Sequence, residues 1–176
     1  MGCPTFEPET LPANLKTVDV MPSKINKDNA GLLPSKAILN QPLKVDGETF
    51  NVTCVGVGNP HAVIFSKFVD KEPVTTLGPK IEHHKAFPER INTEFVRVVG
   101  PNELKMRTWE RGNGETPACG TGACAAAIAA VLNGYSPVNQ NITVKVRGGN
   151  LIVKYTGKTV YLSGNTSICF EGEVEI

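Results

Sequence analysis

The sequence predicts an α+β domain in which an antiparallel or mixed β-sheet curls around one central, buried helix. The helix is predicted by residues 123–132, an alanine-rich run that contains neither a charge nor a proline. Because this run is apolar all round, the helix should be buried on every side, and it is too short to cross a bilayer. The sheet is predicted by the flanking segments, most of which alternate apolar and polar residues as half-buried strands do.

The opening segment, residues 1–42, is rich in proline and asparagine and shows little periodicity. We expect an edge strand followed by a long irregular connection, because proline removes a backbone donor and interrupts regular elements. The core of the domain is predicted over 43–164, and the closing segment 165–176 should contain a last strand at 168–176. Pro4, Pro8, Pro12, Pro22 and Pro34 punctuate the opening segment before it ends at Pro42.

Within the core, the pattern of apolar residues sets the order of the elements. A short helix is expected over 76–86, where Leu77 and Ile81 share one face. Asn133-Gly134 should end the central helix, since glycine is common just past helix ends. Strands are predicted over 50–57, 61–65, 92–99 and 103–109 before the central helix, and over 142–146, 151–155 and 160–162 after it.

Cys119 stands immediately before the central helix, which should begin near Gly120–Gly122. The N-terminus of a helix carries unpaired backbone N–H groups and a partial positive charge. An anion can therefore dock on the amides of Gly120, Thr121 and Gly122. The same field should lower the pKa of the Cys119 thiol and favour the thiolate near neutral pH. An anion site beside a thiolate suits chemistry on a carboxylated or phosphorylated small molecule.

Simpler interpretations of this stretch stay open when the residues are taken alone. Most cysteines are small buried hydrophobes, and glycine-rich turns into helices are common. A Walker-type phosphate loop is not supported, because no Lys-Ser/Thr pair follows the second glycine. We expect no metal site: Cys119 and Cys124 are five residues apart, no Cys-x-x-Cys pair occurs, and the adjacent His83 and His84 should point apart.

Composition indicates the compartment and the classes of partner. With 176 residues and a net charge of +1, the chain suits one domain and gives no sign of nucleic-acid or membrane binding. Its start shows neither a signal-peptide pattern nor an amphipathic membrane helix. The five cysteines are an odd number and suggest no disulfide framework, which predicts a reducing, cytoplasmic environment.

Four motifs, in order along nearly the whole chain, resemble diaminopimelate epimerase. The most specific is the stretch 110–124, Glu-Arg-Gly-Asn-Gly-Glu-Thr-Pro-Ala-Cys-Gly-Thr-Gly-Ala-Cys, which is similar to the C-terminal signature of that family. The order and spacing of all four agree with the family. The other three are Met1-Gly2-Cys3-Pro4, Gly58-Asn59-Pro60-His61 and Phe87-Pro88-Glu89-Arg90-Ile91-Asn92.

The resemblance implies an isomerase that interconverts LL- and meso-diaminopimelate without a cofactor, in lysine and peptidoglycan biosynthesis. Enzymes of that family have two similar halves, each of which supplies one cysteine to a site between them. This sequence opens where the second half begins, and the first-half motif leading to Cys-Gly-Asn-Gly does not occur in it. The resemblance therefore makes 1–176 a C-terminal domain whose partner is the missing N-terminal half. It makes 1–42 the connection between the two halves. It makes 168–176 a strand that returns to the first domain, or a strand that forms a homodimer contact in the absence of that domain.

The resemblance also implies roles around the central helix. Cys119 becomes one of two acid/base groups that act on opposite faces of the α-carbon. Glu110 would sit beside Cys119 and the substrate amine. The amides of Gly120 and Thr121 would hold the α-carboxylate, where they stabilise the developing carbanion.

The remaining motif residues would bind the far amino-acid end of the substrate. Asn59, Asn92 and Arg111 are expected there, with Arg111 making a charge-assisted fork. His61 is expected to assist the other cysteine, the one this chain lacks. Cys124 lies further along the same buried helix, behind the first cysteine and not across a substrate from it. We therefore expect the isolated chain to be inactive.

Three alternatives remain at this point. One is half of a related cofactor-independent racemase, such as one acting on proline or hydroxyproline. Another is a thiol hydrolase that uses Cys119 and His61, although no separate oxyanion arrangement is visible. The third is a non-catalytic domain that binds a carboxylate at the start of the helix or only pairs with another subunit.

Overall fold

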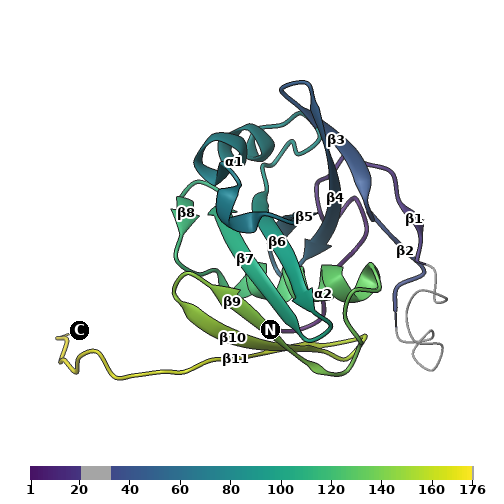
Figure 1. Cartoon of the computed structure of the whole chain (residues 1–176). Helices are drawn as coiled ribbons and strands as arrows, with labels where there is room; N and C mark the ends of the chain where they lie inside the picture. The colour runs from purple at the N-terminus through teal and green to yellow at the C-terminus, as the bar shows by residue number, and fades with distance from the viewer. Residues whose placement is uncertain (21–32, 176) are drawn as a thin grey trace.

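The computed structural model describes residues 1–20 and 33–175 (Figure 1). Its main feature is a nine-stranded mixed sheet in the order β11-β10-β9-β7-β6-β5-β4-β3, with β8 paired to β7. Two short strands, β1 (Val18–Asp19) and β2 (Lys36–Ala37), form a separate pair. The strands of the main sheet are β3 (Gln41–Val45), β4 (Glu48–Gly56), β5 (Pro60–Phe65), β6 (Asn92–Gly100), β7 (Glu103–Glu110), β8 (Gly114–Thr116), β9 (Asn141–Val146), β10 (Gly149–Tyr155) and β11 (Val160–Ser163).

The sheet curls around the long helix α2 (Gly120–Leu132), which Figure 1 shows behind the strands. Every residue of α2 from Gly122 to Leu132 is buried, and α2 contacts β4 to β7 on one side and β9 to β11 on the other. Most of its side chains are alanine methyl groups, which let strands pack close to the helix axis. The predicted central, fully buried helix is confirmed. Within the described ranges, no helix is both long and apolar enough to cross a membrane.

The end of α2 follows the predicted stop signal. The Gly134 amide donates to the Val131 carbonyl at 3.0 Å, and the Tyr135 amide donates to the Ala130 carbonyl at 2.8 Å. Gly134 has a φ of 74°, the left-handed conformation that this pair of bonds requires. The last turn of the helix is therefore capped by its own backbone.

Two strand pairs of the main sheet are parallel, and the β5/β6 pair brings the candidate residues His61 and Asn92 together. β5 pairs with β6 in parallel, and β7 pairs with β9 in parallel, whereas the other pairs of the main sheet are antiparallel. In the β5/β6 register, His61 lies opposite Asn92. Because parallel strands start at the same edge of a sheet, the first residues of these two strands are neighbours.

A second core covers the other face of the sheet. The helix α1 (Val74–Glu82) contacts β3, β6, β7 and β8 there. Its Gly78 lies against the Trp109 ring, where an added Cβ would be 2.4 Å from the ring Cγ. Ile81 of α1 and Phe95 of β6 are both fully buried in this core.

Several boundaries differ from those predicted. The helix expected over 76–86 runs from Val74 to Glu82, and β3 and β8 were not expected. Pro42 lies inside β3, where it is tolerated because β3 is an edge strand. The edge strand expected near the N-terminus is reduced to isolated bridges, Gly2 with Val160 and Thr5 with Gly56. Residues 21–32 of the predicted irregular connection, Pro22 among them, lie outside the described residues.

The last strand predicted at 168–176 is wrong for the residues described. Residues 165–175 form no strand, and they run away from the body of the protein in Figure 1. Ile168, Phe170 and Val174 are 82%, 86% and 82% exposed. The alternation of apolar residues is present, but a strand also needs a partner for its backbone groups, and here these residues pair with none. Residue 176 lies outside the described ranges.

Candidate active site

The candidate site begins where β5 and β6 start side by side. Asn92, the first residue of β6, is 4% exposed. Its Nδ2 donates to the Pro60 carbonyl at 2.8 Å, and its Oδ1 accepts a hydrogen bond from the Arg111 amide at 3.0 Å. Asn92 thus ties the start of β5 to the end of β7 and places three of the predicted motifs next to one another.

His61 is completely buried at the start of β5 and is bonded through both ring nitrogens. Its Nδ1 lies 2.8 Å from Oε1 of Glu94, and its Nε2 lies 2.9 Å from Oδ1 of Asn59. Glu94 is also completely buried, and the Thr108 hydroxyl donates to the same Oε1 at 3.3 Å. The predicted pair Asn59 and His61 is therefore held together, with a buried carboxylate behind it.

Cys119 is the N-cap of α2, as predicted, with the extended backbone (φ −134°, ψ 115°) typical of that position. Its Sγ accepts a hydrogen bond from the Gly122 amide at 3.3 Å and lies 3.5 Å from the Thr121 hydroxyl. The expected three-amide anion site is wrong in one respect, because the sulfur already occupies the Gly122 amide. The amides of Gly120 and Thr121, both half-buried, precede the first intrahelical bond.

The expectation of a lowered thiol pKa is also wrong. Cys119 is only 8% exposed. Burial raises the pKa of the Cys119 thiol above its ordinary value, and the charges of Glu94 and Glu110 raise it further. The hydrogen bonds from Thr121 and Gly122 lower the pKa but do not offset burial. The helix terminus therefore holds a thiol and not a resting thiolate.

The helix start packs directly on the buried carboxylate. A Cβ added to Gly122 would lie 2.7 Å from Oε1 of Glu94 and 3.2 Å from Sγ of Cys119. No larger residue fits at position 122 unless one of these groups moves. Glu94 therefore lies between His61 on one side and Cys119 on the other, and it contacts the surroundings of both.

Glu110 and Arg111 lie at the end of β7, as predicted. Half-buried Glu110 accepts a hydrogen bond from the Thr116 hydroxyl, which also lies 3.3 Å from the Ala118 carbonyl. Glu110 makes no hydrogen bond with Cys119, although its charge acts on the thiol. Arg111 is exposed and donates from Nη1 to the Glu89 carbonyl at 3.0 Å.

The other cysteines fall into two groups. Cys124 and Cys54 are fully buried, and burial raises their thiol pKa values to about 11 and about 12. Cys3 and Cys169 are exposed. Cys3 faces a cavity of about 280 Å³ that is also lined by Asn59 and Thr5. In the described residues, no group of three or more His, Cys, Asp and Glu is arranged to hold a metal ion.

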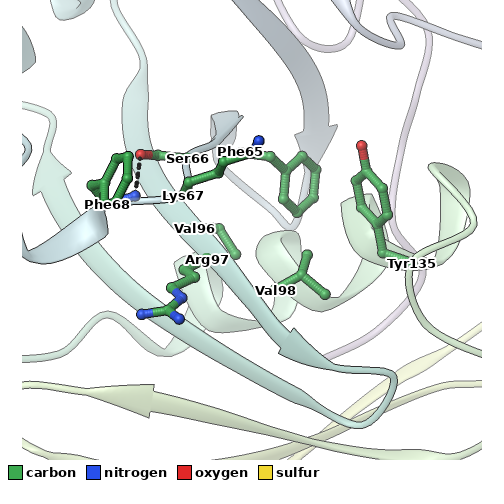
Figure 2. A pocket seen from close by; sticks show the side chains of 8 residues that line it. All are labelled: Phe65, Ser66, Lys67, Phe68, Val96, Arg97, Val98 and Tyr135. Atoms are coloured by element: carbon green, nitrogen blue, oxygen red, sulfur yellow. Dashed lines mark hydrogen bonds between the residues drawn. The ribbon is translucent and has the colours of Figure 1, made fainter.

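A larger groove lies at the opposite end of the same two strands. It measures about 570 Å³ and is lined by Phe65 at the end of β5, Phe68 after that strand, Val98 of β6 and Tyr135 after α2 (Figure 2). Since β5 and β6 are parallel, this groove is separated from His61 and Asn92 by the length of the strands.

Three partners in the site were missed by the sequence analysis, namely Glu94, Thr108 and Thr116. A signal for Glu94 exists, because it shares the parity of Val96 and Val98 in a strand with a buried face. A carboxylate at an apolar position needs a partner. Glu94 and Thr108 are opposite one another in the β6/β7 register, which only the structure reveals.

Comparison with known proteins identifies the family to which the chain belongs. The family model of diaminopimelate epimerase matches residues 53–169, which include the end of β4, the strands β5 to β11 and both α-helices. The chain belongs to the diaminopimelate epimerase family. The match contains Asn59, His61, Asn92 and Cys119, so the residues gathered in the site lie within the part of the chain that the family model matches.

Curated relatives of the family are similar over most of this chain. A diaminopimelate epimerase from Acetivibrio thermocellus is 46% identical over 178 residues, covering 100% of this chain and 56% of that protein. One from Pelotomaculum thermopropionicum is 50% identical over 141 residues, 80% of this chain and 50% of that protein. The chain therefore spans about half the length of the curated relatives it matches. Among solved structures, a phenazine biosynthesis protein of the PhzF family from Bacillus anthracis covers 55% of this chain and 30% of its own, with a TM-score of 0.43 and 20% identity.

Proposed function

We propose that this chain is the C-terminal half of a diaminopimelate epimerase that inverts LL-diaminopimelate to the meso form by two-base chemistry, without a cofactor. The observation that supports this most is Cys119 at the N-cap of a buried helix, near two carboxylates and within the range that the family model matches. The second cysteine would come from an N-terminal half. The resulting enzyme would serve lysine and peptidoglycan biosynthesis in the cytoplasm, where five free cysteines are compatible with a reducing environment.

In the proposed reaction, the thiolate on one face removes the α-proton, and the thiol on the other face delivers a proton to the carbanion. Cys119 provides one of these groups. Its raised pKa makes the thiolate a stronger base once it forms, which suits a weakly acidic C–H bond. Glu110, the half-buried carboxylate at the end of β7, would bind the substrate ammonium group beside Cys119.

The substrate would be held at both ends. The Gly120 and Thr121 amides would bind the α-carboxylate, since the helix terminus stabilises negative charge there. The exposed Arg111 guanidinium would bind the distal carboxylate, together with the amides of Asn59 and Asn92. Asn92 already uses Nδ2 and Oδ1 within the protein, so we assign to it the remaining Nδ2 hydrogen.

The proposal predicts the behaviour of the chain alone and of a completed enzyme. The 176-residue chain should not convert LL-diaminopimelate. Joined to the N-terminal half of the Acetivibrio thermocellus relative, it should convert the substrate and exchange its α-proton in D₂O. Cys119→Ala in the hybrid should lower kcat by about 10²- to 10⁴-fold, the usual contribution of one acid/base group. Cys124→Ala is the matched control, and it should leave kcat within a few-fold.

The outcomes are separable. Conversion by the chain alone would contradict the two-half site. A folded hybrid that racemises proline or hydroxyproline but not diaminopimelate would show that the chain is half of a related racemase. A folded hybrid with full activity after Cys119→Ala would overturn the assignment of this thiol.

A further inference from the structure

We propose that Glu94 is a positioning residue for His61, a role that rests on the function proposed above. Its carboxylate would keep the proton on Nδ1 of His61 and so present Nε2 to the active site as the nitrogen that exchanges protons. Glu94 lies outside the residues that the sequence motifs mark, since the quoted motif ends at Asn92.

The first step in the argument is the burial of Glu94. It is 0% exposed on a strand whose first five residues are all buried. A carboxylate is retained in such a place only at a cost, unless it is bonded and paired. Of its two oxygens, Oε1 is shared by His61 and Thr108, whereas Oε2 is buried without a hydrogen-bond partner among the described residues. An apolar side chain would pack here at lower cost, so the carboxylate is not explained by stability.

The second step concerns the direction of the hydrogen bonds. An ionised carboxylate only accepts, so the 2.8 Å contact places a proton on Nδ1 of His61. Nε2 then faces Asn59, which is half-buried and lines the cavity that also contains Cys3. The ring is therefore buried on its Nδ1 side and directed to the accessible side through Nε2. With Nδ1 protonated, Nε2 can only accept, so the Asn59 amide must turn its Nδ2 to the ring in place of the Oδ1 that lies 2.9 Å from Nε2.

The third step is the effect of removing the carboxylate. Without a charge at Nδ1, neutral His61 can place its proton on Nε2 and donate it to Oδ1 of Asn59, at the 2.9 Å contact. In that tautomer Nε2 has no lone pair for a proton from the site. A histidine whose second nitrogen is fixed by a carboxylate keeps one tautomer and one ring orientation. Glu94 would do this for His61.

The test reads the imidazole of His61 directly by ¹H–¹⁵N NMR at pH 8 in the 176-residue chain and in Glu94→Gln. The wild-type chain should show a protonated Nδ1 and an unprotonated Nε2. Glu94→Gln, which keeps the shape of the side chain, should shift the population toward protonated Nε2. Glu94→Asp should restore part of the wild-type pattern, because it restores the charge.

The matched control is Glu82→Gln. Glu82 is another buried carboxylate, 3% exposed, bonded to the Trp109 indole at 2.7 Å and to the Gly112 amide at 3.0 Å. Its neutralisation should leave the His61 signals unchanged, even if it lowers the unfolding midpoint as much as Glu94→Gln does. A shift of His61 in both variants would show a general loosening and overturn the proposal.

Two further results would contradict the role of Glu94. One is a wild-type ring with Nε2 protonated, alone or together with Nδ1, at pH 8. The other is an unchanged tautomer in Glu94→Gln. In the two-half hybrid, Glu94→Gln should lower kcat by about 10²-fold or more with KM within a few-fold, as expected for a misplaced proton. An inactive wild-type hybrid would contradict the proposed epimerase function, and the NMR result would still decide whether Glu94 fixes His61.

Discussion

Replacing Gly122 by alanine should destabilise the chain, although it puts a better helix former into a helix. Alanine in place of glycine stabilises a helix interior by about 1 kcal/mol. The new Cβ, however, would lie 2.7 Å from Oε1 of Glu94, an oxygen fixed by His61 at 2.8 Å and Thr108 at 3.3 Å. Overpacking a well-fixed group costs about 1–3 kcal/mol. We expect a net loss of up to about 2 kcal/mol in the free energy of unfolding.

Urea unfolding of the 176-residue chain measures this loss, and Gly120→Ala is the control in the same turn. At position 120 the nearest atom to an added Cβ is the flexible end of Leu162, at 3.2 Å, so the change should be close to neutral. Combining Gly122→Ala with Glu94→Ala should cost less than the sum of the two, because the second change removes the clash. If Gly122→Ala is at least as stable as Gly120→Ala, the close packing of helix and carboxylate is wrong.

Two other predictions concern the second core and the thiol. Gly78→Ala should lower the unfolding free energy by about 2 kcal/mol, because its Cβ would be 2.4 Å from the Trp109 ring, which is held by Glu82; a raised melting temperature would refute this. Iodoacetamide should modify Cys119 slowly at pH 7 and faster as the pH rises, since burial raises its pKa and the thiolate forms only at higher pH. Mass spectrometry of Cys119-containing peptides checks this, and rapid labelling that is independent of pH above 7 would contradict it.

Local signals in the sequence were sufficient for the centre of the fold. The uncharged run predicted α2, because a helix that is apolar all round must be buried in the core. Asn133-Gly134 predicted where the helix ends. β4, β6, β7 and β9 to β11 followed from alternation, which is also local, and β5 followed from the turn before it. The short strand β8 was missed because its three residues are too few to show a period. Residues 165–175 alternate well, and they failed as a strand because pairing is not a local property.

The candidate site was predicted less completely, for a different reason. Residues of three motifs lie next to one another at Asn59–His61, Asn92 and Arg111, but their surroundings depend on register. Glu94 meets His61 only because β5 and β6 are parallel with His61 opposite Asn92. The thiol pKa of Cys119 was predicted in the wrong direction, because the helix terminus was visible in the sequence and the burial was not.

The charges around Cys119 explain why one half of such a site should remain protonated until substrate arrives. Glu94 and Glu110 both act against the thiolate, and burial acts against any charge. The start of α2 acts in the opposite direction, because the Gly122 amide donates to the sulfur. An amino-acid substrate brings its own ammonium group next to Glu110, and this cation would offset the carboxylate charge and lower the cost of forming the thiolate. The proposed site therefore would generate its base only when occupied.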